Sequence, residues 1–173
     1  MRNIDEIIKG NKIVVFGDVL RVVPDKDHPD EIDWIREHKA EIMQYIAEKE
    51  RIAREAAEIR QKKIDAIPGL NELRDAHNDL EDWNREFEMS FENGCGGLGV
   101  RKMPEYDFDA LNSRYPVAAA FLKAEAYKLC LNDAKSAAGK KAIERIINGE
   151  DVAVVIADME REWDAHVMAH VWD

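Results

Sequence analysis

The 173-residue chain has little cysteine and no long apolar run, the features that mark disulfide-bonded and membrane proteins. Its two cysteines, Cys95 and Cys130, lie far apart and show no C-x-x-C spacing, so neither a disulfide framework nor a cysteine zinc site is expected. No apolar run approaches the ~20 residues that span a bilayer, and the N-terminus lacks the apolar core of a signal peptide. We therefore expect no membrane contact and a cytoplasmic location.

Basic residues are outnumbered by acidic ones, 25 to 36, which gives a formal charge of −11. Cationic side chains drive nucleic-acid binding by displacing counterions from phosphates, so direct binding of nucleic acid is not expected. The same charge would attract a basic surface on another protein, including a protein that itself holds nucleic acid. The predicted partner is therefore a protein with a basic surface.

Glycine and proline are scarce as well, with nine and five copies, and they punctuate a chain that otherwise favours helices. Apolar residues within positions 3–9 have helical spacing. Two apolar runs then flank Gly17 and Asp18, a pattern typical of a β-hairpin with a two-residue turn and glycine first. A helix begins near Pro29, so the sequence predicts a helix, β-hairpin and helix over residues 1–50.

A long helix is predicted between Pro29 and Ile67, because neither Pro nor Gly interrupts the chain there. Pro68 and Gly69 then supply a turn. The Ile and Ala stripe before this turn is expected to pack against the apolar stripe after it, as a helical hairpin. The stripes are Ile52, Ala56, Ile59 and Ile64 before the turn, and Leu70, Leu73, His77, Leu80, Phe87 and Phe91 after it, with Trp83 beside them.

Two or three further helices are predicted in the last third of the chain. Residues 117–148 form one or two helices, with a break or a weak point near Gly139. Gly149 follows the end of this segment, as glycine often does at helix C-termini. Residues 151–170 carry apolar side chains at helical intervals and form the last element.

The expected fold class is therefore mainly α, formally α+β. An N-terminal helix and β-hairpin are followed by a long helix, a helical hairpin and two or three further packed helices. Residues 1–50 form the head, and residues 51–173 form a helical body with a glycine-rich loop at 93–105.

The string NGCGGLG, residues 93–99, contains the G-x-G-x-x-G pattern of dinucleotide-binding proteins. In those proteins a β-strand precedes the glycines and a helix starts directly after them, which aims N–H groups at phosphate. Here a predicted helix precedes the glycines and no helix start follows. We interpret the string as a helix cap and a flexible loop. The alternative is an interaction loop that includes Arg101 and Lys102, and no catalytic residue is predicted.

The C-terminal stretch EWDAHVMAHVWD offers a candidate metal site. Glu162, His166 and His170 follow one another at steps of four, which places three side chains able to bind metal on one stripe of a helix. The zincin motif needs a Glu directly after the first His, and Val167 stands there instead. The other interpretation is two histidines on the flank of a helix.

Carboxylates concentrate around Trp34 and Trp83, in the stretches DKDHPDEID and DLEDWNREFEMSFEN. Solvated helix faces account for such a pattern. The alternative is a protein-binding face that presents carboxylates in place of phosphates around an aromatic anchor. The candidate partner-binding residues are Trp34, Trp83, Glu86, Glu92, Arg101 and Lys102.

The first fifty residues resemble the TubC N-terminal docking domain of polyketide and peptide synthetase assembly lines. GNKIVVFGDVLRVV and IREHKAEIMQYI carry the similarity, above all residues 38–42. In that family a short helix leads to a β-hairpin and a further helix, the hairpin commonly docks a partner's peptide, and the module often pairs with itself. The resemblance therefore implies a hairpin used for contacts, with a homodimer as one outcome.

The whole layout is similar to that of proteins encoded on phages and mobile elements of gut Firmicutes. Those proteins pair a docking-like head with a helical body that contains a GGLGVR loop and ends in WD. Residues 96–101 and 172–173 carry this similarity. The resemblance implies a bacterial host. Together with the small size, the strong acidity and the lack of a catalytic constellation, it favours an anti-defence, anti-CRISPR-like role.

The leading hypothesis is a non-enzymatic, acidic protein-interaction module without a cofactor. In this hypothesis a phage or mobile-element inhibitor binds and occludes a host-defence effector such as a CRISPR nuclease. One alternative is a metal-binding protein or metal-dependent hydrolase that holds zinc or another divalent metal through Glu162, His166 and His170. The other is a self-associating adaptor built on the hairpin and the long helix.

Overall fold

The computed structural model describes residues 3–17, 19–24, 28 and 31–170, and for His170 only the backbone. Over these ranges the chain is mainly helical, with eight helices and one two-stranded antiparallel sheet, which confirms the expected fold class. It divides into two compact units, residues 1–59 and 60–173. None of the helices within the described ranges is both long and apolar enough to cross a membrane.

The N-terminal unit contains the predicted hairpin. Its elements are α1 (Ile4–Gly10), β1 (Ile13–Phe16), β2 (Val19–Val22), α2 (Glu31–Glu37) and the first part of α3 (Lys39–Asp65). The register pairs Ile13 with Val22 and Phe16 with Val19, which leaves positions 17 and 18 as the turn. Gly17 has a φ of +56°, the sign that the first position of such a turn requires. Asp18 lies outside the described residues.

A small apolar core holds this unit together. Its fully buried members are Ile7, Ile13, Ile35 and Ile42, one or more from each helix and from β1. Asn11 is buried beside them, and its amide nitrogen donates to the Ile7 carbonyl at 3.0 Å and to the Glu31 carboxylate at 2.8 Å. An unsatisfied buried amide costs about 1–3 kcal/mol, so these bonds fix α1 against α2.

The long helix expected after Pro29 is interrupted. α2 ends at Glu37, α3 begins at Lys39, and His38 lies in a turn between them. The His38 ring stacks on Trp34 at 4.1 Å between centroids, and its Nδ1 lies 2.8 Å from the Trp34 carbonyl oxygen. A side chain that binds the carbonyl four residues earlier favours a local bend, which the apolar spacing alone does not indicate.

The predicted Ile stripe lies on α3, but its members in the middle of the helix are exposed to solvent. Ile52 and Ile59 are 53% and 58% exposed, so the expected burial of the stripe is wrong for these two residues. Ile64 near the end of the helix is buried with Leu70 and Leu73, as expected.

The middle of α3 is supported by ion pairs of Arg51 with Glu48 and Glu55. Such pairs contribute about 0.2–0.5 kcal/mol each in helices, and they join a high helix propensity.

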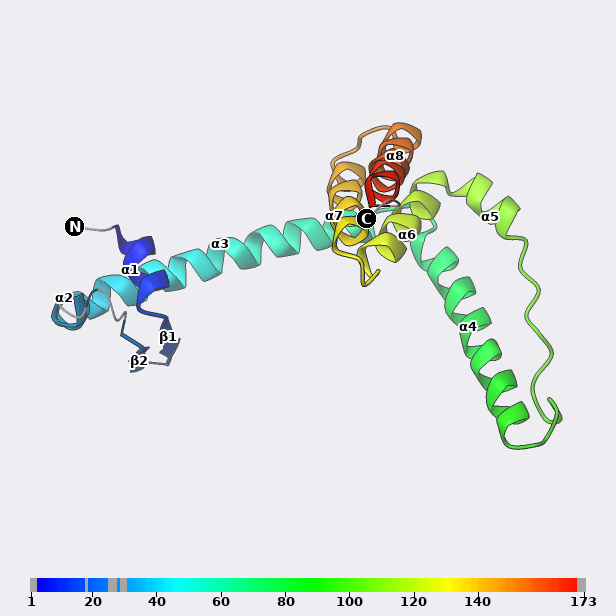
Figure 1. Cartoon of the computed structure of the whole chain (residues 1–173), viewed down its shortest axis with the longest axis horizontal. Coiled ribbons are helices and arrows are strands. Elements are labelled where there is room, and N and C mark those ends of the chain that lie inside the picture. The colour runs from blue at the N-terminus through cyan, green and yellow to red at the C-terminus, as the bar shows by residue number, and fades with distance from the viewer. Residues whose placement is uncertain (1–2, 18, 25–27, 29–30, 171–173) are drawn as a thin grey trace. The chain divides into compact units, whose positions relative to one another are not determined.

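The C-terminal unit is a helical bundle with one long projecting helix. Its elements are the end of α3, α4 (Leu70–Glu92), α5 (Phe108–Arg114), α6 (Pro116–Lys128), α7 (Asp133–Ile147) and α8 (Val152–His170). Helices α6, α7 and α8 lie side by side, as the yellow to red ribbons of Figure 1 show. Leu73, Phe121 and Val155 are among the side chains completely or almost completely buried in its core.

Gly139 does not break the helix in which it lies, contrary to the expected break or weak point. The break lies instead between Lys128 and Asp133, where Asn132 caps α7 by accepting bonds from two backbone N–H groups. Gly139 sits inside α7 against the backbone of α6, where an added Cβ would lie 2.4 Å from the Lys128 nitrogen. Only glycine allows two helices this close an approach, so the residue serves packing.

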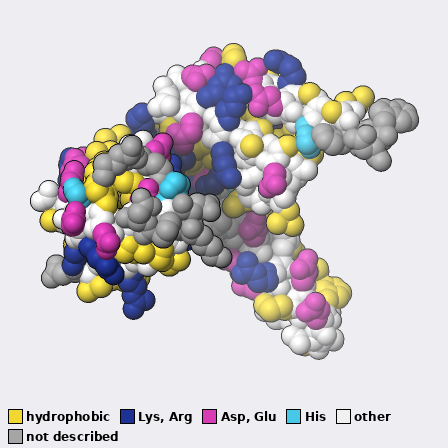
Figure 2. Space-filling view, turned by 60° about the vertical axis from the view of Figure 1, so that its left-hand side comes forward, with side chains coloured by type: hydrophobic (Ala, Val, Ile, Leu, Met, Phe, Trp, Pro, Cys, Tyr) yellow, Lys and Arg dark blue, Asp and Glu magenta, His cyan; other side chains and the backbone are white. Residues whose placement is uncertain are grey.

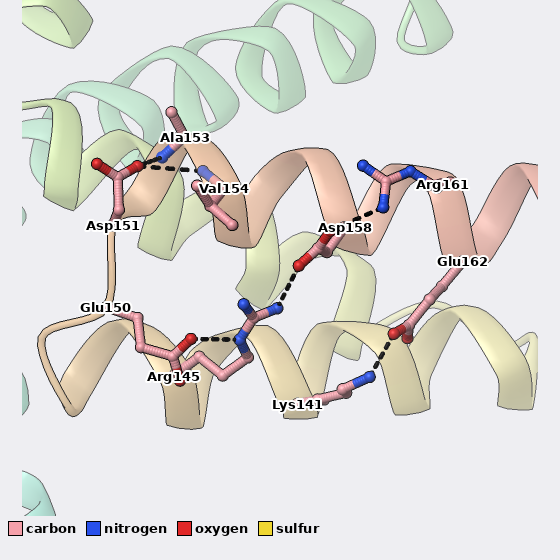
Figure 3. A network of polar contacts seen from close by, with 9 residues as sticks. All are labelled: Lys141, Arg145, Glu150, Asp151, Ala153, Val154, Asp158, Arg161 and Glu162. Atoms are coloured by element: carbon pink, nitrogen blue, oxygen red, sulfur yellow. Dashed lines mark hydrogen bonds and ion pairs between the residues drawn. The ribbon is translucent and has the colours of Figure 1, made fainter.

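A network of ion pairs joins α7 to α8 on the outside of the bundle (Figure 3). Arg145 of α7 contacts Glu150 in the loop at 2.8 Å and Asp158 of α8 at 3.0 Å. Asp158 also pairs with Arg161 on its own helix. Asp151 caps α8 by accepting from the backbone N–H groups of residues 153 and 154. These contacts fix the start of α8 beside the end of α7.

Candidate protein-interaction surface

The segment that follows α4 in the sequence lies along the part of α4 that projects beyond the bundle. Residues 93–107, here called the return segment, run back along α4 to the start of α5 (Figure 1). Together with residues 79–92 of α4 they form what we call the arm. The return segment has no regular secondary structure, so its position depends on side-chain contacts with α4.

Asp79 is the polar centre of these contacts. Its carboxylate accepts hydrogen bonds from the guanidinium of Arg101 and, at 2.9 Å, from the hydroxyl of Tyr106. Arg101 also donates to the Asp79 carbonyl oxygen at 3.1 Å and lies 3.4 Å from Glu86. The bonds from Arg101 and then Tyr106 lower the pKa of Asp79, and the same carboxylate raises the pKa of Tyr106. Asp79 therefore binds the return segment in its ionised form.

Aromatic contacts continue this attachment toward the end of α4. The Trp83 indole N–H donates to the Arg101 carbonyl oxygen at 2.8 Å, and the Trp83, Phe87 and Phe91 rings contact one another in sequence. Gly97 packs on Phe87, where an added Cβ would approach the ring to 3.0 Å, and its φ of +83° also favours glycine. The return segment is thus fixed against α4 at both its polar and its aromatic contacts.

The end of the arm exposes apolar side chains. Met89 and Phe91 of α4 are 49% and 56% exposed, and Leu98 of the glycine-rich loop is 82% exposed. We call these three residues the arm tip. Scattered exposed apolar residues are normal on proteins, but apolar side chains from two adjoining segments held by a fixed backbone are typical of contact sites.

Negative charge gathers on the same part of the chain. Residues 72–109 carry eleven Asp or Glu and four Lys or Arg, a formal charge of −7, whereas the rest of the C-terminal unit, 60–71 and 110–173, carries eleven of each sign. Basic side chains lie among the acidic ones over the face in Figure 2, so no continuous acidic surface covers it. The excess of carboxylates is therefore a property of the arm and its base.

The six predicted partner-binding residues are divided between the two units. Trp34 lies in the N-terminal unit, where it packs on the apolar core. Trp83, Glu86 and Arg101 come together on the arm as described above. Their contacts are intramolecular, so they position the return segment.

Glu92 and Lys102 are the remaining two of that set. Both are exposed on the arm, and Lys102 pairs with Glu105 of the return segment at 2.6 Å. The sequence analysis took candidates from the arm but did not include Met89 or Leu98. Leu98 inside an otherwise glycine-rich loop was the available signal, since a large apolar side chain there has no periodic role in a core.

The glycine string has the local structure expected of a helix end. α4 precedes it and ends at Glu92, the Asn93 N–H bonds back to Met89, and the next helix starts only at Phe108. No strand delivers the glycines and no helix N-terminus follows them, so the geometry for holding a pyrophosphate is missing over residues 89–108. The string closes the arm.

The candidate metal ligands lie on α8, but two of them are already engaged. Glu162 pairs with Lys141 of α7, toward which Figure 3 shows it pointing. His166 is half-buried and stacks on Trp163 at 5.7 Å. The His170 side chain lies outside the described residues, as do Trp172 and Asp173. Among the side chains that are described, no group of three His, Cys, Asp or Glu is placed to hold a metal ion.

The arm therefore combines a backbone held against α4, an apolar tip and an excess of carboxylates. No protein-family model, no curated protein and no solved structure matches the chain.

Proposed function

We propose that the protein is a non-enzymatic protein-interaction module that binds its partner through the arm. The observation that carries the proposal is the exposed apolar tip, held by the Asp79, Trp83 and Gly97 contacts on a segment without regular structure of its own. A surface that is ordered before binding loses little conformational entropy on binding. The tip is therefore suited to enter a preformed apolar pocket.

The chemistry of the partner follows from the tip and its surroundings. Burial of a Phe or Leu side chain contributes about 1.5–3 kcal/mol, which makes Phe91 and Leu98 the expected anchors. The formal charge of −7 over residues 72–109 would steer a partner with basic residues around that pocket. Association should then slow as salt rises, while the apolar anchors keep much of the equilibrium affinity.

In its specific form, the proposal is a phage or mobile-element inhibitor that occludes a basic surface of a host-defence effector such as a CRISPR nuclease. It is supported by the formal charge of −11. Occlusion needs no catalytic group of its own, since a rigid acidic body in a nucleic-acid channel excludes the substrate.

The test compares two leucines that differ in position but not in chemistry. Leu98→Ser changes the tip, and Leu131→Ser changes a fully exposed leucine in the loop between α6 and α7, outside the arm. Wild type and both variants serve as bait in a bacterial lysate that contains a CRISPR effector, and the retained protein is then purified for titration calorimetry. We expect Leu98→Ser to weaken binding about tenfold or more, from the lost burial, and Leu131→Ser to bind as wild type.

Equal binding by the two variants would refute the role of the tip. The specific form has its own readout, which is DNA cleavage by the purified effector with increasing amounts of the protein. Unchanged cleavage at saturating wild type would refute inhibition and leave partner binding to be judged by the leucine pair.

A further inference from the structure

A groove of about 960 Å³ runs over the C-terminal unit, lined mainly by three of its helices, with Asn112 of α5 beside them. α6 forms the floor, and one face each of α4 and α8 forms the walls. From α4 the contributing residues are Arg74, His77, Asn78 and Glu81, at helical spacing, and from α8 they are Val152, Ala153, Ile156, Ala157 and Glu160. A trough lined lengthwise by three helix faces is the space that a fourth helix fills in a bundle.

The floor of the groove and its α8 wall are mainly apolar and low, whereas the α4 wall is polar. Ala119, Ala120 and Ala126 of α6 line it, and Ala153 and Ala157 of α8 stand across from them. Small side chains allow the backbone of a neighbouring helix to approach to about 8 Å, the short end of the usual interaxial range. The α6 face that lines the groove, from Pro116 to Leu129, extends over about 20 Å at 1.5 Å per residue. That length suits three to four turns of a helix.

The cations within the groove are already paired. Arg74 contacts Glu125 at 3.0 Å, and Lys123 pairs with Glu160. Glu81 has no basic partner among the contacts of the described residues. The charged side chains that line the groove therefore leave an excess of one carboxylate, which lies on the α4 wall.

The same face of α4 continues beyond the groove as a mainly acidic stripe, in which the one cation, Arg85, already pairs with Asp82 at 3.1 Å. Glu88 and Glu92 follow Glu81 at steps of seven and eleven residues, which returns them to within about 20° of its direction on a helix with 100° per residue. Asp79 and Ser90, which hold the return segment, lie about 160–180° away on the opposite face. The return segment thus leaves the groove side of α4 uncovered, and both Glu88 and Glu92 are exposed.

We propose that this groove binds an amphipathic helix of a partner protein, with the apolar face on the alanine floor and a basic end along the α4 stripe. Charge complementarity identifies the basic end, because Glu81, Glu88 and Glu92 extend the groove in one direction only. A second copy of this chain is a poor occupant, since two chains of formal charge −11 repel. The surface is distinct from the arm tip, so this proposal stands or falls separately from the proposed function.

The probe is a synthetic 14-residue peptide with leucines at i, i+3, i+4 and i+7 spacing, glutamine and alanine elsewhere, and three lysines at its C-terminal end. One control peptide has the same composition with the leucines scrambled, and a second has glutamates in place of the lysines. Fluorescence anisotropy of the labelled peptides is measured against the full chain. We expect saturable one-to-one binding of the probe, with both controls about tenfold weaker or more, a difference of about 1.4 kcal/mol.

Matched variants of α8 locate the binding. Ala157→Arg places a long cationic side chain in the groove, whereas Ala165→Arg places it on an exposed position of the same helix outside the groove. Ala157→Arg should weaken the probe about tenfold or more, and Ala165→Arg should bind it as wild type. Glu81→Lys, on an exposed site whose change leaves the core intact, should weaken the lysine probe and strengthen the glutamate peptide.

Equal effects of the two arginine variants, or equal binding of the amphipathic and scrambled peptides, would overturn the proposal. Absence of saturable binding would do so too, including the case in which the groove takes only a small apolar molecule. Leu98→Ser should bind the probe as wild type, since the arm tip lies outside the groove. A failure here is therefore distinguishable from a failure of the arm-tip binding described above.

Discussion

Gly139→Ala tests how α6 and α7 pack, because two accounts of this glycine predict opposite signs. If Gly139 only weakens its helix, alanine stabilises the protein by about 0.8–1 kcal/mol through helix propensity. If the glycine is required by the contact, alanine overpacks it. The structure places the added Cβ 2.4 Å from the Lys128 nitrogen and 2.7 Å from the Ala124 carbonyl oxygen.

The magnitude follows from what can move. Both neighbouring atoms belong to the backbone of α6, so no side chain can rotate away from the new methyl group, and the helices must separate. Overpacking of a filled core costs about 1–3 kcal/mol, and propensity returns about 1 kcal/mol of this. Because only backbone atoms oppose the methyl group, the cost falls in the upper half of that range, about 2–3 kcal/mol. We therefore expect a net loss of about 1–2 kcal/mol and a fall in Tm of several degrees.

Urea and thermal unfolding followed by circular dichroism provide the assay. Ala137→Gly is the matched control, because Ala137 is exposed on the same helix and loses about 1 kcal/mol by propensity alone. The two exchanges are opposite in chemistry, yet both should lower the same transition midpoint. A higher midpoint for Gly139→Ala would refute the close approach of α6 and α7.

Two further predictions concern the attachment of the return segment. Asp79→Asn removes the carboxylate that binds Arg101 and Tyr106, so trypsin should cut after Arg101 or Lys102 several times faster. The control is Asp82→Asn, which affects only the ion pair with Arg85 and should leave the cleavage rate unchanged. The pKa of Asp79 is lowered in the folded chain, so its contribution is present above the unfolded value of about 3.9 and is lost as the pH falls through the lower folded value. The rate of amide hydrogen exchange in residues 93–107, corrected for the intrinsic rate, should be constant from neutral pH to about 4.5 and should rise below pH 4. If the Asp79→Asn variant shows the same rise, Asp79 is not its origin.

Local signals in the sequence predicted the elements that depend on neighbouring residues. The hairpin turn follows from a glycine at the position that needs a positive φ, and the ends of α4 and α7 follow from Asn93 and Asn148 with the glycines after them. Gly139 misled because its role depends on a contact with Lys128, eleven residues earlier on another helix. A glycine within a helix weakens that helix when it faces solvent, and it allows close packing when it faces the backbone of another helix, as Gly139 does.

The sequence named residues of the arm as candidates but did not indicate what they contact, for a similar reason. Arg101 was a candidate contact for a partner because it follows the glycines and precedes a proline. The structure places its guanidinium on Asp79, 22 residues away in sequence, and its carbonyl on Trp83. Pairings over this separation depend on the path of the return segment, which no periodic pattern encodes. The exposure of Leu98 has only a local signal, a large apolar side chain among glycines.

The placement of side chains on α4 implies that its two surfaces can be changed independently. Asp79 and Trp83 hold the return segment on one side, while Glu81 and the groove lie on the other. Free-energy changes at sites without shared contacts add to within about 0.3–0.5 kcal/mol. If one partner occupied both surfaces, Leu98→Ser and Ala157→Arg would each weaken it, and the double variant would lose the sum of the two. If the surfaces serve different partners, each variant would weaken one complex and leave the other at wild-type affinity.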